Sequence, residues 1–315
     1  MILAAIYQPL LIIAAALAGI GLGRVPGIDE IAVHLVEPAL TALLYFVFLS
    51  ADGGQLRAAF RNVRFTMTAA AANFVWTPLF AYALGMLFFR ESIDMRIGLM
   101  MLLVTPCTDW YLVFTALARG NVILGASILP LNLTLQILLL PVYLGLFYGD
   151  AMPAAGSSLI LGIVLLLALP LGLAFLTKTA EHDRLGARCV RQLRAHGDTA
   201  QLILLLIAVG AMFAAESAAF FAHPMLFADM LFVMLIFFAV NYILVRRLGR
   251  RLGFAGADLT ALSFTTLARN SPLALAIAAA AFPDRPLIAL ALIIGPLIEL
   301  PALTVVAHRI LREHR

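Results

Sequence analysis

The sequence predicts an all-α polytopic membrane protein, and its composition is the first reason. Of the 315 residues, 63% are hydrophobic and 12% are charged, whereas soluble proteins have roughly 45–50% and about 25%. The mean hydropathy is +1.04. Since about 20 apolar residues cross a bilayer as a helix, the chain holds enough apolar sequence for on the order of ten crossings. A soluble globular protein is excluded.

Ten apolar segments are the second reason. Each is long enough to cross a bilayer, and no connection between them is long enough for a soluble domain. The first segment has no basic residues before it and is as long as the later ones, so we expect a retained helix and not a cleaved signal. The segments cover residues 4–22, 31–50, 65–89, 97–117, 122–148, 157–177, 199–221, 224–245, 258–281 and 287–308.

The distribution of basic residues is the third reason, and it also predicts the orientation. Sixteen of the 21 Lys and Arg residues follow the second, fourth, sixth, eighth or tenth segment, four lie on the opposite side, and Arg269 lies inside a segment. Because cytoplasmic loops are enriched in Lys and Arg, we expect a multi-pass protein of the cell membrane with both termini in the cytoplasm. These loops account for the net charge of +4, so no nucleic-acid partner is expected.

The ten segments divide into two sets of five, over about 1–150 and 151–315, within a single membrane transporter domain that covers 1–315. An odd number of crossings in each set gives the two sets opposite orientations. This is the inverted-repeat arrangement of many secondary transporters, whose substrates bind near the middle of the membrane where interrupted helices of the two repeats meet. The sequence therefore predicts a matched pair of interrupted segments.

Two segments carry a proline near the middle of a polar stretch. Pro106 lies in segment 97–117 and Pro272 in segment 258–281, and each segment is the fourth of its set. Proline removes a backbone hydrogen bond and collides with the preceding turn, and the freed backbone groups need a partner or a water-filled cavity. We therefore expect both helices to break there and the two breaks to cross at the midplane.

Charged residues flank both prolines. Asp109 lies three residues after Pro106, and Arg269 lies three residues before Pro272. A charge at this depth costs a few kcal/mol or more, so it is usually paired or functional. We expect Asp109 and Arg269 to lie close together and to frame a substrate cavity; the alternative is a structural ion pair that only joins the two sets. The other residues expected around the cavity are Cys107, Thr108, Thr265, Thr266, Asn270 and Ser271.

Further polar residues lie inside other segments. They either line the same cavity or form hydrogen bonds between helices, and the sequence leaves both possibilities open. These residues are Glu37, Asn73, Asn132, Gln136 and Glu299.

The sequence excludes several kinds of chemistry. Cys107 and Cys189 are far apart, which excludes a disulfide framework or a four-cysteine zinc site, and the six histidines show no metal-ligand spacing. Phosphate-binding loops and hydrolase motifs are missing. We therefore expect no metal, no cofactor and no enzymatic activity. Transport would depend on an ion gradient or the membrane potential, or be passive, and an intramembrane enzyme or receptor has only the polar cavity in its favour.

Two stretches resemble the bile acid:sodium symporter superfamily. The first has T-P-C-T at 105–108, F-T-A-L-A-R-G-N at 114–121 and L-L-P at 139–141, and is similar to the fourth and fifth helices of that superfamily. The second, F-T-T-L-A-R-N-S-P-L-A-L-A at 264–276, is similar to the ninth helix. Pro-Cys-Thr at 106–108 resembles the arsenical-resistance (arsenite permease) branch.

This resemblance implies ten helices in two inverted five-helix repeats. The third to fifth and eighth to tenth helices would form a core, in which helices four and nine cross, and the first, second, sixth and seventh would form a panel. The resemblance also implies a role for Cys107 in arsenite transport.

The chain departs from the family at the ion sites. Sodium-coupled members carry Ser-Asn in the fourth helix and Glu with Gln-Asn in the ninth. Here these positions hold Tyr111-Leu112, Thr265 and Arg269-Asn270, which argues against the family's sodium sites. The arsenite permeases carry Glu where this chain has Pro272, and we hypothesise that Asp109 supplies the missing acid.

The leading functional hypothesis is a secondary active transporter that exports arsenite or antimonite, coupled to protons or to the membrane potential. Cys107 would contact the soft metalloid, although a buried cysteine also serves as a small hydrophobic residue. Asp109 would be the coupling group, with Thr265 beside it and Arg269 as its partner. The alternative is an ion-coupled organic-anion symporter in which Arg269 binds the anion. The expected partners are a small-molecule or metalloid substrate, a coupling ion and the bilayer, and the oligomeric state stays open.

Overall fold

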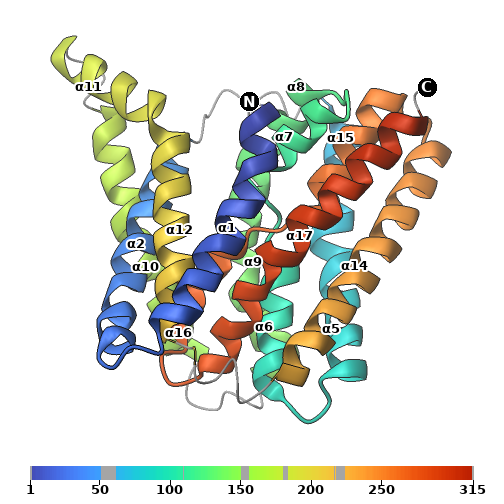
Figure 1. Ribbon diagram of the computed structural model, residues 1–315. Coiled ribbons are helices and arrows are strands. Elements are labelled where there is room, and N and C mark those ends of the chain that lie inside the picture. The colour runs from blue at the N-terminus through green and yellow to red at the C-terminus, as the bar shows by residue number, and fades with distance from the viewer. Residues whose placement is uncertain are drawn as a thin grey trace.

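The protein is a bundle of helices. The computed structural model describes residues 2–50, 62–108, 110–149, 156–179, 184–215, 217 and 224–313. Over these residues all regular structure is helical, and most helices run roughly along one common direction (Figure 1). This arrangement agrees with the predicted polytopic membrane architecture.

All five segments predicted in the first half are helical. The third is one continuous helical run that contains a π-helical turn, η1, and the fourth is interrupted, as its proline predicts. In chain order the elements are α1 (Ile2–Leu22), α2 (Ile28–Ser50), α4 (Val63–Ala71), η1 (Ala72–Trp76), α5 (Thr77–Phe88), α6 (Ile93–Val104), α7 (Trp110–Leu117), α8 (Val122–Ser127) and α9 (Leu129–Tyr148).

The segments predicted in the second half are helical as well over the residues that the structure describes, and residues 216 and 218–221 of the seventh segment lie outside them. The ninth is interrupted, and the eighth and tenth extend beyond their apolar stretches into Arg-containing turns. The elements are α10 (Gly156–Thr179), α12 (Gly197–Ala215), α14 (Pro224–Arg251), α15 (Gly256–Leu267), α16 (Ser271–Ala281) and α17 (Pro286–Glu313).

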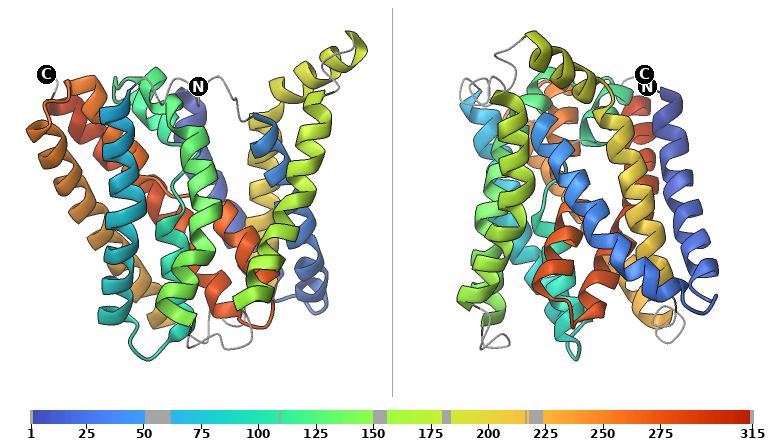
Figure 2. Two further views of the ribbon diagram at one scale, coloured as in Figure 1. Left: turned by 180° about the vertical axis from the view of Figure 1, so that it is seen from behind. Right: turned by 90° about the vertical axis from the view of Figure 1, so that its left-hand side faces the viewer.

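One helix was not expected from hydropathy. The connection after the sixth segment forms α11 (Arg184–Ala195), which lies at one end of the group formed by α2, α10 and α12 (Figure 2). Val190 is buried, whereas Arg188 and Arg191 are exposed. The helix is therefore amphipathic, and a search for long apolar stretches does not detect such a helix.

The helices pack in two groups. One consists of α1, α2, α10 and α12, and the other includes α5, α6, α14, α15, α16 and α17. Figures 1 and 2 show α2, α10 and α12 on one side of the molecule and α5 and α14 on the other. The groups meet where α16 contacts α2 and α10, and where α17 contacts α1.

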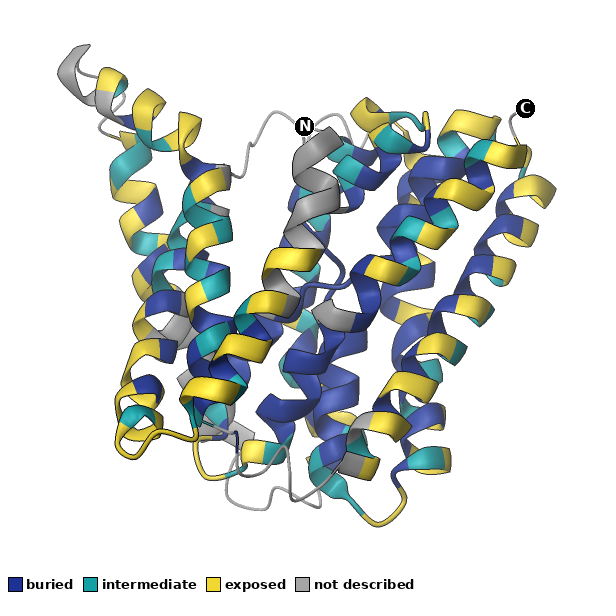
Figure 3. Cartoon of the chain, viewed as in Figure 1, coloured by how far each residue is buried: buried dark blue, intermediate teal, exposed yellow. Residues whose placement is uncertain are grey.

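Apolar side chains cover the outside of the bundle. Leu87, Leu146 and Phe175 are 72%, 73% and 65% exposed, and exposed positions follow the outer faces of the helices in Figure 3. By contrast, nearly every residue of α6 from Met95 to Val104 is buried. A surface of large apolar side chains around a buried centre suits lipid as the solvent.

Within the part of the chain that the structure describes, four helical runs are long and apolar enough to cross a membrane by themselves: Val63–Phe88, Val122–Tyr148, Ala228–Arg251 and Pro286–Glu313. Helix α1 begins and α17 ends at the same end of the bundle (Figure 1), as an even number of crossings requires. The protein is therefore a multi-pass helical membrane protein.

Helices α1 and α12 approach each other closely at Gly19. A Cβ atom at this position would collide with the carbonyl oxygen of Gly210. Close contact through small residues is the main way in which membrane helices gain packing energy. In the same helix, a Cβ atom at Gly21 would meet no atom within 4 Å.

Gly19→Ala is therefore expected to destabilise the protein by about 1–3 kcal/mol, because α1 has to move away from α12. Gly21→Ala, the matched control, is expected to leave stability unchanged or raise it, since alanine is the better helix former. Thermal unfolding of the detergent-solubilised variants measures both effects. Equal midpoints for the two variants would contradict the predicted contact.

Candidate functional site

The two interrupted segments lie against each other at their breaks. The stretch between α6 and α7 runs antiparallel to the stretch between α15 and α16. The N–H of Cys107 donates to the carbonyl oxygen of Ala268 at 3.0 Å, and the N–H of Asn270 donates to the carbonyl oxygen of Thr105 at 2.6 Å. The two breaks therefore cross and are held together by backbone hydrogen bonds.

Pro106 and Arg269 face each other between these two hydrogen bonds. At such a position of an antiparallel pair, neither residue uses its own N–H in the pairing. Pro106 has no N–H, and its presence here therefore removes no hydrogen bond between the two stretches. The N–H of Arg269 points away from the bridge and donates to Oε1 of Glu299 at 2.9 Å. The Glu299 carboxylate on α17 thus accepts a hydrogen bond from the Arg269 N–H, which takes no part in the pairing of the two stretches.

Asn270 connects α16 to the opposite break. Its side-chain oxygen accepts a hydrogen bond from the N–H of Leu273 at 3.2 Å, which caps α16, and its amide nitrogen donates to Oγ1 of Thr108 at 3.3 Å. Pro272 follows in the first turn of α16, where helical N–H groups have no intrahelical partner. The break therefore ends in a regular helix start.

The guanidinium group of Arg269 is buried and binds the ends of two helices. Nη1 donates to the carbonyl oxygen of Leu103 at 2.8 Å and Nε to that of Leu267 at 3.2 Å, and Nη2 donates to that of Thr266. The ring centroid of Phe237 lies 5.1 Å from the guanidinium carbon. Last-turn carbonyls have no intrahelical partner and carry partial negative charge. Arg269 therefore stabilises the C-terminal ends of α6 and α15 together.

Asn73 extends this network to η1. Its Oδ1 accepts from Nη2 of Arg269 at 3.2 Å, and its Nδ2 donates to the carbonyl oxygen of Thr265 at 3.2 Å. A π-helical turn frees a carbonyl from the regular ladder, and here Tyr143 donates to the carbonyl oxygen of Phe74 at 2.6 Å. The irregular turn thus brings a polar side chain to the crossing.

Three buried polar side chains at or next to this network have polar atoms without a partner among the described residues. Asn132 donates to Oγ1 of Thr265 at 3.2 Å. Its Oδ1, both amide atoms of Gln136 and Oγ of Ser271 have no hydrogen-bond partner among the described residues, and the three residues are at most 2% exposed. A buried polar atom without a partner costs roughly 1–3 kcal/mol, so such a group indicates water or a ligand.

The structure brings most of the predicted site residues together at the crossing and leaves the predictions for Asp109 and Glu37 open. The residues assembled there are Cys107, Thr108, Thr265, Arg269, Asn270, Ser271, Asn73, Asn132 and Glu299. Gln136 lies one helical turn beyond Asn132 on α9. Asp109 and the side chain of Glu37 lie outside the described residues, so the contact between Asp109 and Arg269 stays a prediction.

Other contributors were missed in the sequence. Tyr143 and Phe237 contact the network, and Thr105 donates to the carbonyl oxygen of Met101 at 2.9 Å, which satisfies an acceptor at the end of α6. Only Thr105, directly before a proline, carried a local signal. Among the described residues, no group of three or more His, Cys, Asp or Glu is placed to hold a metal ion.

Crossed, interrupted helices inside a helical membrane bundle are typical of secondary transporters. Residues 37–223 match the Sodium Bile acid symporter family. The arsenical-resistance protein Acr3 of Corynebacterium glutamicum is 24% identical over 244 residues, which cover 73% of this chain and 65% of that protein. The chain thus spans less than two thirds of the length of this relative.

Because the family match covers more than half of the chain, the protein belongs to the Sodium Bile acid symporter family. The first stretch that resembles this family, 105–141, lies within the matched residues, so that resemblance is confirmed, whereas the second, 264–276, lies outside them.

The contacts of Arg269 predict that a lysine cannot replace it. Arg269→Lys keeps the charge but replaces a planar fork by a single nitrogen, which cannot reach carbonyls on both α6 and α15. We expect a loss of about 2–4 kcal/mol of stability, measured as a lower thermal midpoint in detergent. Arg312→Lys, at an exposed position of α17, is the control, and equal midpoints would show that Arg269 is not structural.

Proposed function

We propose that the protein is a secondary active transporter that exports arsenite or antimonite, coupled to protons or to the membrane potential. The observation that carries this proposal is the position of Cys107, whose backbone pairs with the opposite interrupted helix. A cysteine sulfur is the side-chain ligand best suited to a soft metalloid. The similarity to a protein named for arsenical resistance supports the same substrate.

The unpartnered polar groups at or next to the crossing network suit a hydroxylated substrate. Trivalent arsenic in neutral water carries hydroxyl groups, which both donate and accept hydrogen bonds. Asn132 offers a buried acceptor, Gln136 offers a donor and an acceptor, and Ser271 offers a hydroxyl group. None of these atoms has a partner among the described residues. We assign these side chains, with Thr108 and Asn270, to the substrate site.

Arg269 and Glu299 have a different part in this proposal. Nε, Nη1 and Nη2 of Arg269 all donate to protein acceptors, which supports a structural role over binding of an organic anion. The positive charge of Arg269 at the crossing also disfavours binding of a sodium ion beside it, because like charges repel each other. We therefore assign coupling to Asp109 and Thr265, with protonation of Asp109 as the step that changes the balance between inward and outward states.

A reciprocal pair of contacts supports two inverted repeats, about 1–150 and 151–315. Asp94, in the first turn of α6, forms an ion pair with Arg285, which follows α16. Asp258, in the first turn of α15, accepts a hydrogen bond at 2.8 Å from Asn121, which follows α7. Each interrupted segment thus begins beside the end of the other, as a two-fold relation requires.

The packing supports the division into two units within this arrangement. We assign α1, α2, α10 and α12 to a panel, and the helices around the crossing to a core. With ten crossings, the arginine-rich connections and both termini face the cytoplasm of a cell membrane. Motion of the core against the panel then gives alternating access to the crossing.

The organic-anion alternative rests on the family description, which names bile acid. It requires a cationic group directed at the substrate. An experiment can distinguish the two hypotheses, because uptake of an organic anion would not change when Cys107 is substituted.

Cells lacking their own exporters are expected to accumulate less arsenite when they express the wild type. Cys107→Ser is expected to abolish this effect, because the hydroxyl group is a hard ligand and binds the metalloid weakly. Cys189→Ser is the matched control. It changes the second cysteine of the chain, which lies on α11, and should export like the wild type. Normal export by Cys107→Ser at equal expression would overturn the proposed thiol contact.

Gln136→Leu separates a substrate contact from a structural role. Leucine has a similar volume and removes two buried polar atoms without partners, so thermal stability is expected to stay equal or to rise by about 1 kcal/mol. Export is nevertheless expected to be lost, because the substrate loses its hydrogen bonds. A variant that is less stable and still exports arsenite would show that Gln136 is structural.

A further inference from the structure

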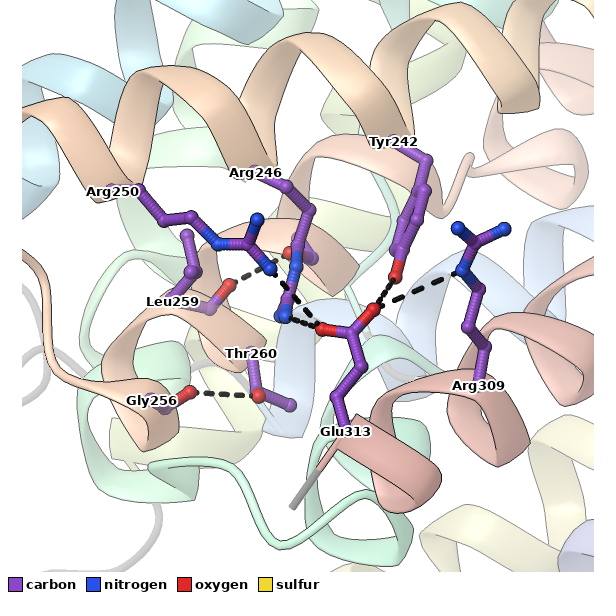
Figure 4. Close-up of polar contacts among 9 residues, drawn as sticks. Tyr242, Arg246, Arg250, Gly256, Leu259, Thr260, Arg309 and Glu313 are labelled. Atoms are coloured by element: carbon purple, nitrogen blue, oxygen red, sulfur yellow. Dashed lines mark hydrogen bonds and ion pairs between the residues drawn. The ribbon is translucent and has the colours of Figure 1, made fainter. Parts of the chain in front are cut away.

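Three arginines converge on one carboxylate at the ends of α14 and α17 (Figure 4). Glu313 forms ion pairs with Arg246, with Arg250 at 3.3 Å and with Arg309 at 3.8 Å. Tyr242 donates a hydrogen bond to the same carboxylate at 3.2 Å. We call these five residues the Glu313 cluster.

The Glu313 cluster carries an excess of positive charge. Three guanidinium groups face a single carboxylate, which leaves a formal charge of +2. The ion pair between Arg285 and Asp94, by contrast, joins one cation to one anion. One arginine would be enough to balance the charge of Glu313, so the cluster has two arginines more than charge balance requires.

Arg246 shows that the cluster is incomplete. Its side chain is only 8% exposed, and Nη2 donates to Glu313. Its Nε and Nη1 are buried and have no hydrogen-bond partner among the described residues. Buried donors on a charged group are costly to leave unbound, and a guanidinium group forms its strongest hydrogen bonds with an anionic acceptor.

The cluster is open to ligands at its rim. The side chains of Arg250 and Arg309 are 61% and 68% exposed, whereas Arg246 lies deeper. Arg246 and Arg309 both lie near the Tyr242 ring, with guanidinium carbons 5.8 and 5.4 Å from its centroid. The aromatic ring thus restricts the positions of two guanidinium groups at the junction of two membrane helices.

We propose that the Glu313 cluster binds a phosphate group. Guanidinium forks match phosphate oxygens in charge and geometry, and basic clusters between membrane helices near the bilayer surface bind anionic head groups. The phosphate belongs either to an anionic phospholipid or to a soluble phosphate ion. It binds beside Glu313 and contacts Arg250 and Arg309, whose exposed side chains form the rim of the cluster above the buried Arg246.

The test measures the thermal midpoint of the full chain in detergent against increasing phosphatidylglycerol, with phosphatidylcholine as the zwitterionic control. A second series uses inorganic phosphate against chloride at equal ionic strength. The double variant Arg250→Gln/Arg309→Gln is expected to weaken apparent binding about tenfold or more, because two charge-assisted hydrogen bonds are lost. The matched control Arg247→Gln/Arg312→Gln removes two exposed arginines from the same helices and is expected to bind like the wild type.

Glu313→Gln provides a second, opposite readout. It removes the competing carboxylate and raises the formal charge of the cluster, so apparent binding is expected to become tighter. A response to phosphatidylglycerol alone identifies a lipid head group, and an equal response to inorganic phosphate identifies the free ion. The proposal is overturned if neither ligand shifts the wild-type midpoint, if the control variant loses as much binding as the cluster variant, or if Glu313→Gln binds more weakly.

Discussion

Backbone hydrogen bonding in an apolar medium is the constraint on which this structure depends. A helix that breaks inside a bilayer leaves N–H and carbonyl groups that lipid cannot bind. In this protein two breaks solve the problem together. The N–H groups of Cys107 and Asn270 bind carbonyls of the opposite break, and the Arg269 side chain binds the carbonyls that end α6 and α15. Since neither break is satisfied alone, the two halves of the chain depend on each other.

This solution also decides where chemistry is possible. Arg269, the charged group with the strongest donors, is occupied by main-chain oxygens, and the carboxylate of Glu299 is bound to a main-chain N–H. Among the described residues, the polar groups at the crossing that retain binding capacity are neutral: the amides of Asn132 and Gln136 and the hydroxyl of Ser271. The described charges at the crossing therefore bind main-chain groups, and neutral polar groups are what they leave for a substrate.

Local chemistry made the crossing predictable. Pro106 and Pro272 interrupt apolar segments at equivalent places, and proline stereochemistry acts within one turn. Glu299 and Asn73 were recognised as buried polar residues, but their partners were not. The sequence does not show that Asn73 lies in a π-helical turn, nor that Tyr143 binds the carbonyl freed beside it. Similarly, α11 has alternating basic and apolar residues that a scale for long apolar stretches does not register.

The sequence by itself determined the helical membrane class, the positions of the apolar segments and the two breaks. These properties follow from hydropathy and from proline, which act over short stretches of chain. Only the tertiary structure decided what Arg269 binds, because its acceptors are main-chain carbonyls and one of them, on Leu103, is 166 residues away. The same holds for Arg246 and Glu313, which meet across 67 residues. A carbonyl oxygen carries no residue-specific signal, so its partner is fixed only when distant segments pack together.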